Sequence, residues 1–185
     1  QAALKNAPTI QYGQDFLAEN IKLTQSGTFF DYTYKQYKFD NVKTNLLGRH
    51  QAVNVSTALT AYLVYCEKVN LLPDEQHIRF ALSNIVWMGR MQLLKTNPAV
   101  IVDGAHNLQG IQTFASNLQE LFPQKKLLLV VSILADKDYK HMLQSLVPFA
   151  QCFYISKNES DRAAEIADQV NVIAETGCNY KTAPT

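Results

Sequence analysis

Two short polar segments stand just after apolar runs of the chain. Residues 103–107 (Asp-Gly-Ala-His-Asn) follow the run 99–102, and residues 136–138 (Asp-Lys-Asp) follow the run 126–134. In open parallel sheets, ligands bind at the carboxyl ends of strands. Asp103 can accept hydrogen bonds from two ribose hydroxyls, and exposed N–H groups at the start of the next helix favour an anion. The two segments indicate a nucleotide or phosphate site; the competing interpretation is that they only cap helices.

Three further residues have side chains suited to the same ligand. His50 and Asn54 stand four positions apart in a stretch with helical periodicity, so both side chains lie on one helix face. Arg90 carries a planar guanidinium that matches phosphate oxygens. Each also has an ordinary structural interpretation, as part of a polar helix start or as a surface cation. The residue types alone leave both interpretations open.

The first half of the chain must provide the elements that hold His50 and Asn54. Short runs of Tyr, Phe, Thr and Ile separated by turn residues predict a small antiparallel sheet. Apolar residues then recur every three or four positions, which predicts helices. The expected strands are 9–12, 21–24, 28–34 and 37–39, and the expected helices are 50–68 and 74–85.

The second half alternates apolar runs with amphipathic helices. This alternation predicts a mostly parallel sheet covered on both faces, and right-handed crossovers make it Rossmann-like. The expected fold class is therefore α/β, with the small sheet-and-helix region in front and a boundary near 85–96. The expected strands are 99–102, 126–134 and 151–156, and the expected helices are 108–122, 137–146 and 161–170.

The charge and cysteine patterns exclude several classes of function. A formal net charge of +1 with interspersed signs gives no polybasic face, which argues against nucleic acid and membrane as partners. The longest apolar run, 127–134, is far shorter than the roughly 20 residues that span a bilayer. The cysteines, at 66, 152 and 178, form no zinc or disulfide pattern, and the four scattered histidines lack metal-ligand spacing. No metal site is expected among these residues.

Four motifs occur in an order that resembles one enzyme family. Residues 47–54 (Leu-Gly-Arg-His-Gln-Ala-Val-Asn) match an LxGxHQxxN pattern, and Gly89-Arg90 matches a GR pair. Further along, 103–107 matches DGAHN and 136–138 matches DKD. In this order the motifs resemble those of the folylpolyglutamate synthases, within the Mur ligase superfamily, and the resemblance covers essentially the whole chain.

The resemblance implies a role for each candidate residue. Asn54 corresponds to an asparagine that contacts adenine, and His50 stands one helical turn before it. Arg90 corresponds to an arginine at the nucleotide phosphates, and Asp103 to a ribose-binding aspartate. The expected ATP-binding residues are His50, Asn54, Arg90 and Asp103, and the expected catalytic residues, near the incoming glutamate or the transferred phosphate, are His106 and Lys137.

The implied enzyme is a cytoplasmic, monomeric ligase that uses ATP and Mg²⁺ to add L-glutamate to reduced folate through an acyl phosphate. Residues 1–86 are expected to be the end of its central ATP-binding domain, and 87–185 its C-terminal domain, incomplete at its end. The sequence has no GxxxxGK[ST] loop, so the Mg²⁺ ligands are expected upstream. It also begins with Gln1 and carries Leu108 where the family has proline. We therefore expect an excised piece that is inactive alone.

Three other interpretations stay open. The intact enzyme could also act as a dihydrofolate synthase, or the chain could come from another Mur-type amino-acid ligase. A non-catalytic, Rossmann-like nucleotide-binding module is the alternative from a different class. The His50-Gln51 pair and the segment 103–107 favour the folate branch, because the peptidoglycan branch typically carries HN and a DYAH-like turn at these places.

Overall fold

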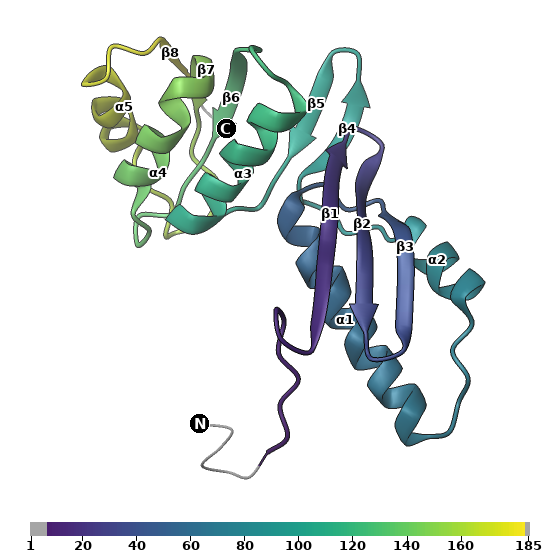
Figure 1. Cartoon of the computed structure of the whole chain (residues 1–185). Helices are drawn as coiled ribbons and strands as arrows, with labels where there is room; N and C mark the ends of the chain where they lie inside the picture. The colour runs from purple at the N-terminus through teal and green to yellow at the C-terminus, as the bar shows by residue number, and fades with distance from the viewer. Residues whose placement is uncertain (1–6, 184–185) are drawn as a thin grey trace. The chain divides into compact units, whose positions relative to one another are not determined.

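A computed structural model of the chain describes residues 7–183. The chain divides into two compact units, Gln1–Val102 and Asp103–Thr185, and each is described by itself (Figure 1). The expectations about the ends of the chain concern residues 1–6 and 184–185, which lie outside the described residues. No helix within residues 7–183 is both long enough and apolar enough to cross a membrane.

A three-stranded antiparallel sheet opens the first unit. Its strands are β1 (Phe16–Thr24), β2 (Gly27–Tyr34) and β3 (Tyr37–Thr44), in that order, which confirms the small sheet expected from the sequence. The turn between β1 and β2 requires glycine at position 27. Gly27 has φ +141°, and a Cβ there would lie 2.4 Å from the carbonyl oxygen of Thr44.

The expected strand at 9–12 is wrong. Only Tyr12 forms a bridge, an isolated one to Phe16. The backbone N–H of Gln11 donates to Asp15 Oδ2 at 2.7 Å, and the N–H of Asp15 donates back to the carbonyl oxygen of Gln11 at 2.9 Å. These two bonds close a turn, so regular strand pairing begins only after it.

Two helices complete the core of the first unit. The expected helices are confirmed as α1 (Arg49–Lys68) and α2 (Glu75–Ser83). Figure 1 shows α1 lying across one face of the sheet and α2 beside β3. At this interface the hydroxyls of Tyr32 and Thr60 lie 2.6 Å apart, fully inside the core. Burial raises the pKa of Tyr32 to about 12, so this residue acts as a neutral, hydrogen-bonded core side chain.

A hairpin of β4 (Gln92–Thr96) and β5 (Ala99–Val102) ends the first unit. The two strands pair antiparallel with each other. We expected 99–102 to be the first strand of the parallel sheet, and that prediction is wrong. Asn97 and Pro98 form a two-residue connection that turns the chain straight back, so the nearest partner of β5 is the preceding strand.

The second unit holds a parallel sheet, as the α/β fold class predicted. Its order is β6 (Leu127–Val131), β7 (Ala150–Ile155) and β8 (Tyr180–Thr182), with both pairs parallel. The last strand was not expected. The expected helices are present, though the third is shifted along the chain. They are α3 (Leu108–Leu121), α4 (Tyr139–Leu146), followed by the short 3-10 helix η2 (Val147–Phe149), and α5 (Ile166–Ala174).

Helices cover one face of this sheet among the described residues. Leu129, Phe153 and Ile155 point into a core shared with α3, α4 and α5. On the opposite face of β6, Leu128 is 60% exposed and Val130 is 76% exposed. The expectation that both faces of every strand are covered is therefore not met for β6 in residues 7–183.

The third helix starts five residues later than expected. We predicted 161–170, but α5 begins at Ile166. The backbone N–H of Ala164 donates to the carbonyl oxygen of Ile133 at 2.9 Å, and Ala163 forms an isolated bridge with Leu134. The carbonyl oxygen of Arg162 also accepts the N–H of Ala135 at 2.7 Å, so it is not available to the N–H of Ile166 as a helix start at 161 would require.

Candidate functional site

Strand β2 fixes the start of α1. Gly48 is the N-cap of α1, and it has no side chain that could cap the helix. Thr28 Oγ1 accepts the N–H of Gly48 at 3.1 Å and donates to the carbonyl oxygen of Leu46 at 2.7 Å. Thr28 is completely buried, so water does not compete for these bonds. The first turn of α1 also carries no acidic residue, so its N–H groups suit an anion.

His50 and Asn54 are linked through Gln51 on this first part of α1. Gln51 Nε2 lies 3.0 Å from His50 Nε2, and Asn54 Nδ2 donates to Gln51 Oε1 at 3.1 Å. An amide nitrogen only donates, so His50 Nε2 accepts and the proton of the neutral ring is on Nδ1. Gln51 is buried and Asn54 is exposed. The chain of bonds thus fixes Asn54 while its amide oxygen can accept a bond from a ligand.

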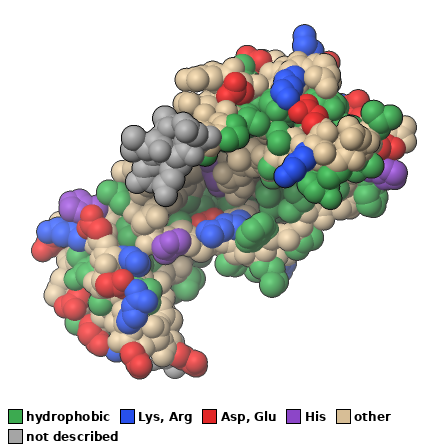
Figure 2. Space-filling model, turned by 90° about the horizontal axis from the view of Figure 1, so that it is seen from below, with side chains coloured by type: hydrophobic (Ala, Val, Ile, Leu, Met, Phe, Trp, Pro, Cys, Tyr) green, Lys and Arg blue, Asp and Glu red, His purple; other side chains and the backbone are tan. Residues whose placement is uncertain are grey.

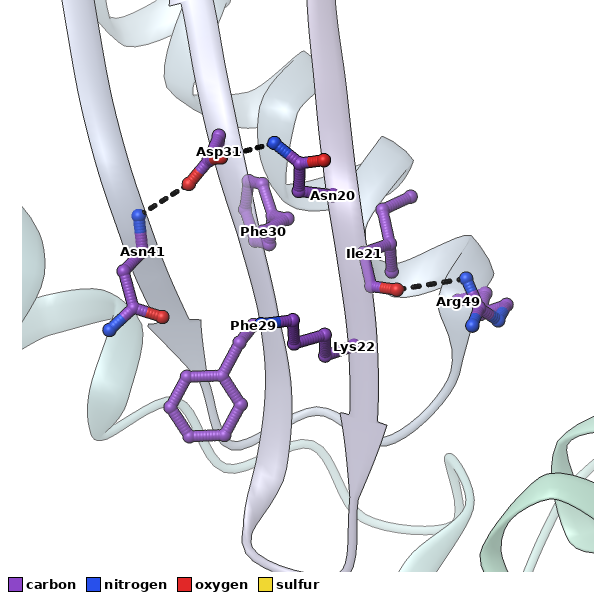
Figure 3. A pocket seen from close by; sticks show the side chains of 8 residues that line it. All are labelled: Asn20, Ile21, Lys22, Phe29, Phe30, Asp31, Asn41 and Arg49. Carbon is purple, nitrogen blue, oxygen red and sulfur yellow. Dashed lines mark hydrogen bonds between the residues drawn. The ribbon is translucent and has the colours of Figure 1, made fainter.

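An open hollow of about 760 Å³ is lined by residues of β1, β2 and β3 and by Arg49 of α1 (Figure 3). One of the lining residues, Asp31 of β2, accepts bonds from both neighbouring strands: from Asn20 Nδ2 and from the backbone N–H of Asn41, each at 2.7 Å. The N–H of Asn41, and then the amide of Asn20, hold the pKa of Asp31 below its usual value. Arg49 Nη1 donates to the carbonyl oxygen of Ile21 at 2.9 Å. The hydrogen bonds around the hollow therefore join the three strands to one another and the start of α1 to β1.

Arg90 lies just before the β4–β5 hairpin. Its exposed side chain lines a smaller hollow of about 300 Å³ within the first unit, together with Trp87 and Leu93. The preceding Gly89 has φ +68°, and its N–H donates to Gln92 Oε1 at 3.1 Å. This tight turn presents Arg90 at the surface.

The segment 103–107 forms a compact turn before α3. Asp103 Oδ1 accepts the N–H of Ala105 at 2.7 Å, and His106 Nδ1 lies 3.0 Å from the carbonyl oxygen of Gly104. A carbonyl only accepts, so His106 Nδ1 carries the proton and the exposed Nε2 can act as an acceptor. Asn107 Oδ1 accepts the N–H of Gly110 at 2.7 Å and caps α3. The capping interpretation therefore holds for Asn107, while Asp103 turns the chain without capping the helix.

This turn lies at the carboxyl edge of the parallel sheet. Helix α3 ends at Leu121 and β6 starts at Leu127, so the helix runs back against the strand and its first residues lie beyond the strand's end. Ala105 also packs against the core cluster that contains Ile133, which follows β6. The turn with His106 and the loop after β6 therefore share one edge of the sheet.

The loop after β6 carries Asp136 between two cations. Arg162 Nη2 donates to Asp136 Oδ2 at 2.5 Å, and Lys137 Nζ lies 3.3 Å from the same oxygen. The Arg162 guanidinium, with a smaller part from Lys137, holds the pKa of Asp136 below its usual value. Asp136 is therefore a carboxylate at neutral pH.

Asp138 has a different role in the same loop. It is the N-cap of α4, and its carboxylate lies 2.7 Å from His141 Nδ1. The bond to His141 holds the pKa of Asp138 below its usual value. The second aspartate of the DKD motif thus starts a helix, and the first one faces the cations.

The predicted site residues fall into groups in both units. His50 and Asn54 share the start of α1, and Arg90 lies elsewhere in the first unit. In the second unit, His106 and Lys137 share the carboxyl edge of the sheet. Three residues that hold these side chains are not among the predicted site residues, although two of the three belong to the quoted motifs. They are Gln51, Asp136 and Arg162.

The described residues do not fit a Mg²⁺ site. Mg²⁺ requires several oxygen ligands in near-octahedral geometry. Within residues 7–183 there is no group of three or more His, Cys, Asp or Glu side chains that could hold a metal ion.

Comparisons with known proteins give relatives that match most of the chain. The dihydrofolate synthase/folylpolyglutamate synthase of Bacillus subtilis is 28% identical over 150 residues, which are 80% of this chain and 35% of that protein. The crystal structure of folylpolyglutamate synthase from Thermotoga maritima matches with a TM-score of 0.84 and 26% identity, over 99% of this chain and 42% of that one. The Mycobacterium tuberculosis folylpolyglutamate synthase complexed with ADP matches with a TM-score of 0.88 and 23% identity, over 99% of this chain and 41% of that one.

The chain spans about a third of the length of its curated relatives. A family model described as Mur ligase, glutamate ligase domain matches residues 89–185, which are more than half of the chain. The match includes the turn at 103–107, the loop at 136–138 and the parallel sheet that carries them. The chain therefore belongs to the Mur ligase family and carries its glutamate ligase domain.

Proposed function

We propose that the chain is part of an ATP-dependent ligase that adds L-glutamate to folates, as folylpolyglutamate synthases do. The observation that carries this proposal is the placement of the 103–107 turn and the 136–138 loop at one edge of the parallel sheet. That edge is where open α/β sheets bind ligands. The similarity to folylpolyglutamate synthases over 80% or more of the chain supports the same conclusion.

In this proposal each unit carries residues that are assigned to the nucleotide. Residues 1–86 form the end of a central ATP-binding domain, and 87–185 form the glutamate ligase domain. Asn54 presents its amide oxygen to the adenine, with His50 behind it. Arg90 contacts the phosphates and Asp103 the ribose. The ADP in the Mycobacterium structure supports ATP as the nucleotide.

The reaction joins two half-steps. The folate γ-carboxylate attacks the γ-phosphate of ATP and forms an acyl phosphate and ADP. The α-amine of glutamate then attacks the acyl carbon, and phosphate leaves as the amine loses a proton. In such phosphoryl transfer, catalysis is mainly positioning and electrostatic stabilisation. We propose that the ammonium of Lys137 stabilises negative charge on the transferred phosphate or the incoming glutamate. The free Nε2 of His106 accepts a hydrogen bond from the glutamate.

Other parts of the proposal lie outside the described residues. Mg²⁺ would be held by residues upstream of this sequence, together with the phosphate-binding loop that the sequence does not contain. The intact enzyme would work as a monomer in the cytoplasm. Dihydrofolate synthase activity is a further possibility, supported by the relative from Bacillus subtilis whose name includes it.

The direct test is ATP-dependent incorporation of labelled glutamate by the full-length protein. Reduced folate monoglutamate, dihydropteroate and a UDP-linked muramyl substrate would be compared under identical conditions. We expect incorporation into folate. Additional transfer to dihydropteroate would identify a bifunctional enzyme. Transfer to the muramyl acceptor alone would contradict the proposal and favour another Mur-type ligase, and no transfer to any acceptor would favour a nucleotide-binding module.

A further inference from the structure

The loops after β6 and β7 are joined into one substructure. The N–H of Ala135 donates to the carbonyl oxygen of Arg162 at 2.7 Å. At the base of the two loops, Ser132 Oγ accepts from the N–H and the side-chain amide of Asn158, at 2.9 and 3.0 Å. These bonds connect residues that lie 26 or 27 positions apart in the sequence. The two loops therefore hold each other in place.

A shared carboxylate completes this connection. Asp136 Oδ2 accepts from Arg162 Nη2 at 2.5 Å and lies 3.3 Å from Lys137 Nζ. The backbone of Arg162 is already fixed by its bond to Ala135, so the ion pair immobilises only the side chains. This lowers the conformational entropy that an exposed ion pair ordinarily loses.

The charges of the three side chains explain why both cations are present. Lys137 alone with Asp136 would form a neutral pair with little attraction for an anion. Because Arg162 also pairs with Asp136, it neutralises part of the negative charge that Lys137 would otherwise face. The three side chains together carry one net positive charge. The flexible four-carbon stem of Lys137 also needs a fixed anchor if its ammonium is to meet a ligand at a defined place.

From these contacts we infer that Arg162 is a positioning residue: it orients Asp136, which holds the ammonium of Lys137 toward the incoming glutamate or the transferred phosphate. This inference rests on the proposed function. It assigns to the loop after β7 a part in the reaction, although this loop supplies no predicted site residue. Arg162 itself touches neither substrate nor nucleotide in this account.

The chain offers a matched control on the same loop. Lys157 and Glu165 form another exposed ion pair, and no hydrogen bond or ion pair joins it to Asp136 or Lys137 within residues 7–183. A loss of general loop stability would affect Lys157→Ala and Arg162→Ala in the same way. If Arg162 has a positioning role, only Arg162→Ala loses activity. Arg162→Lys should then restore part of the activity, because it keeps a positive charge beside Asp136.

The experiment compares these variants with Asp136→Asn in the full-length protein. For Arg162→Ala and Asp136→Asn we expect kcat/KM for glutamate to fall about tenfold or more, since small misplacements in an active site are costly. The KM for ATP and the melting temperature should stay near wild type. A carboxyl ¹³C NMR titration of Arg162→Ala should show the Asp136 pKa moving up toward its usual value.

Two results would overturn the inference. One is wild-type glutamate kinetics in Arg162→Ala; the other is an equal loss in Lys157→Ala accompanied by a lower melting temperature. Neither result contradicts the proposed function, provided that the wild-type protein transfers glutamate. Failure of the wild-type protein to transfer glutamate to any acceptor overturns the proposed function, and the inference with it.

Discussion

Asp31 shows how one exposed carboxylate can organise a sheet. It bonds Asn20 of β1 and Asn41 of β3, and both asparagines have positive φ, at 51° and 49°. The pairing of β2 with each neighbour shifts register close to these residues. The left-handed backbone at such irregularities is tolerated by asparagine better than by most residues. Asp31 thus stabilises two irregular strands at once.

We expect this stabilisation to depend on pH. The pKa of Asp31 is lower in the folded protein than its ordinary value of 3.8, so the carboxylate contributes stability above that value. The contribution is lost as the pH falls through the folded pKa. Asp31→Asn should therefore lower the urea midpoint at pH 7, and the difference from wild type should shrink below about pH 4. Asp40→Asn is the control, because no hydrogen bond to its carboxylate occurs within residues 7–183. An equal effect of both variants at all pH values would contradict the prediction.

Asn54 provides the residue-scale test of the proposed nucleotide site. Asn54→Ala removes the amide oxygen proposed to contact adenine. The loss of one hydrogen bond, about 1 kcal/mol, raises the KM for ATP about fivefold. The KM for glutamate should not change. Thr57→Ala, one turn further along α1 and also exposed, serves as the control. An unchanged KM for ATP in Asn54→Ala would remove this residue from the site.

The spacing of His50 and Asn54 predicts one shared helix face, because spacing is a local property of a helix. Their assignment to the nucleotide comes from the family resemblance and stays a prediction. The sequence did not identify Gln51 as their connection, since a side-chain bond depends on rotamers that the spacing does not determine. Arg162 was expected on a helix. Its contact with Asp136 joins segments 26 positions apart, and nothing in the local sequence indicates such a contact.

At the scale of elements, a single buried hydroxyl holds the loop that leads into α1. Thr28→Val keeps the shape of the side chain but removes the bonds of the hydroxyl to the loop before α1. The N–H of Gly48 then loses its partner in a buried place. We expect a loss of about 1–3 kcal/mol in the free energy of unfolding, measured by urea denaturation. Thr57→Val on the exposed side of α1 should have a much smaller effect.

The elements that were predicted correctly have strong local patterns, and the errors have identifiable causes. Helices α1 and α3 have clear amphipathic or packing periodicity. Strand β8 has only three residues, too short for a recognisable pattern. The expected place of 99–102 in the parallel sheet was wrong because pairing depends on which strand is near, and the β4 sequence gave little indication of a strand.

At the scale of the whole molecule, the chain lacks the parts that phosphoryl transfer requires. It has no GxxxxGK[ST] loop, and residues 7–183 hold no group suited to a metal ion. We expect the 185-residue chain alone to incorporate no labelled glutamate with ATP, Mg²⁺ and reduced folate. The full-length protein in the same assay is the control. Turnover by the isolated chain would contradict the assignment of phosphate binding to upstream residues.

The central place of β7 has a consequence for hydrogen exchange. β7 is paired on both sides, and Phe153 and Ile155 are completely buried, whereas β8 has three exposed residues. Exchange of the β7 amides requires separation from two neighbours and loss of the core, so these amides should be the slowest to take up deuterium in the second unit. The loops with Lys137 and Arg162 extend from β6 and β7, the pair of strands that opens last. Those loops therefore keep a fixed base even when β8 separates from the sheet.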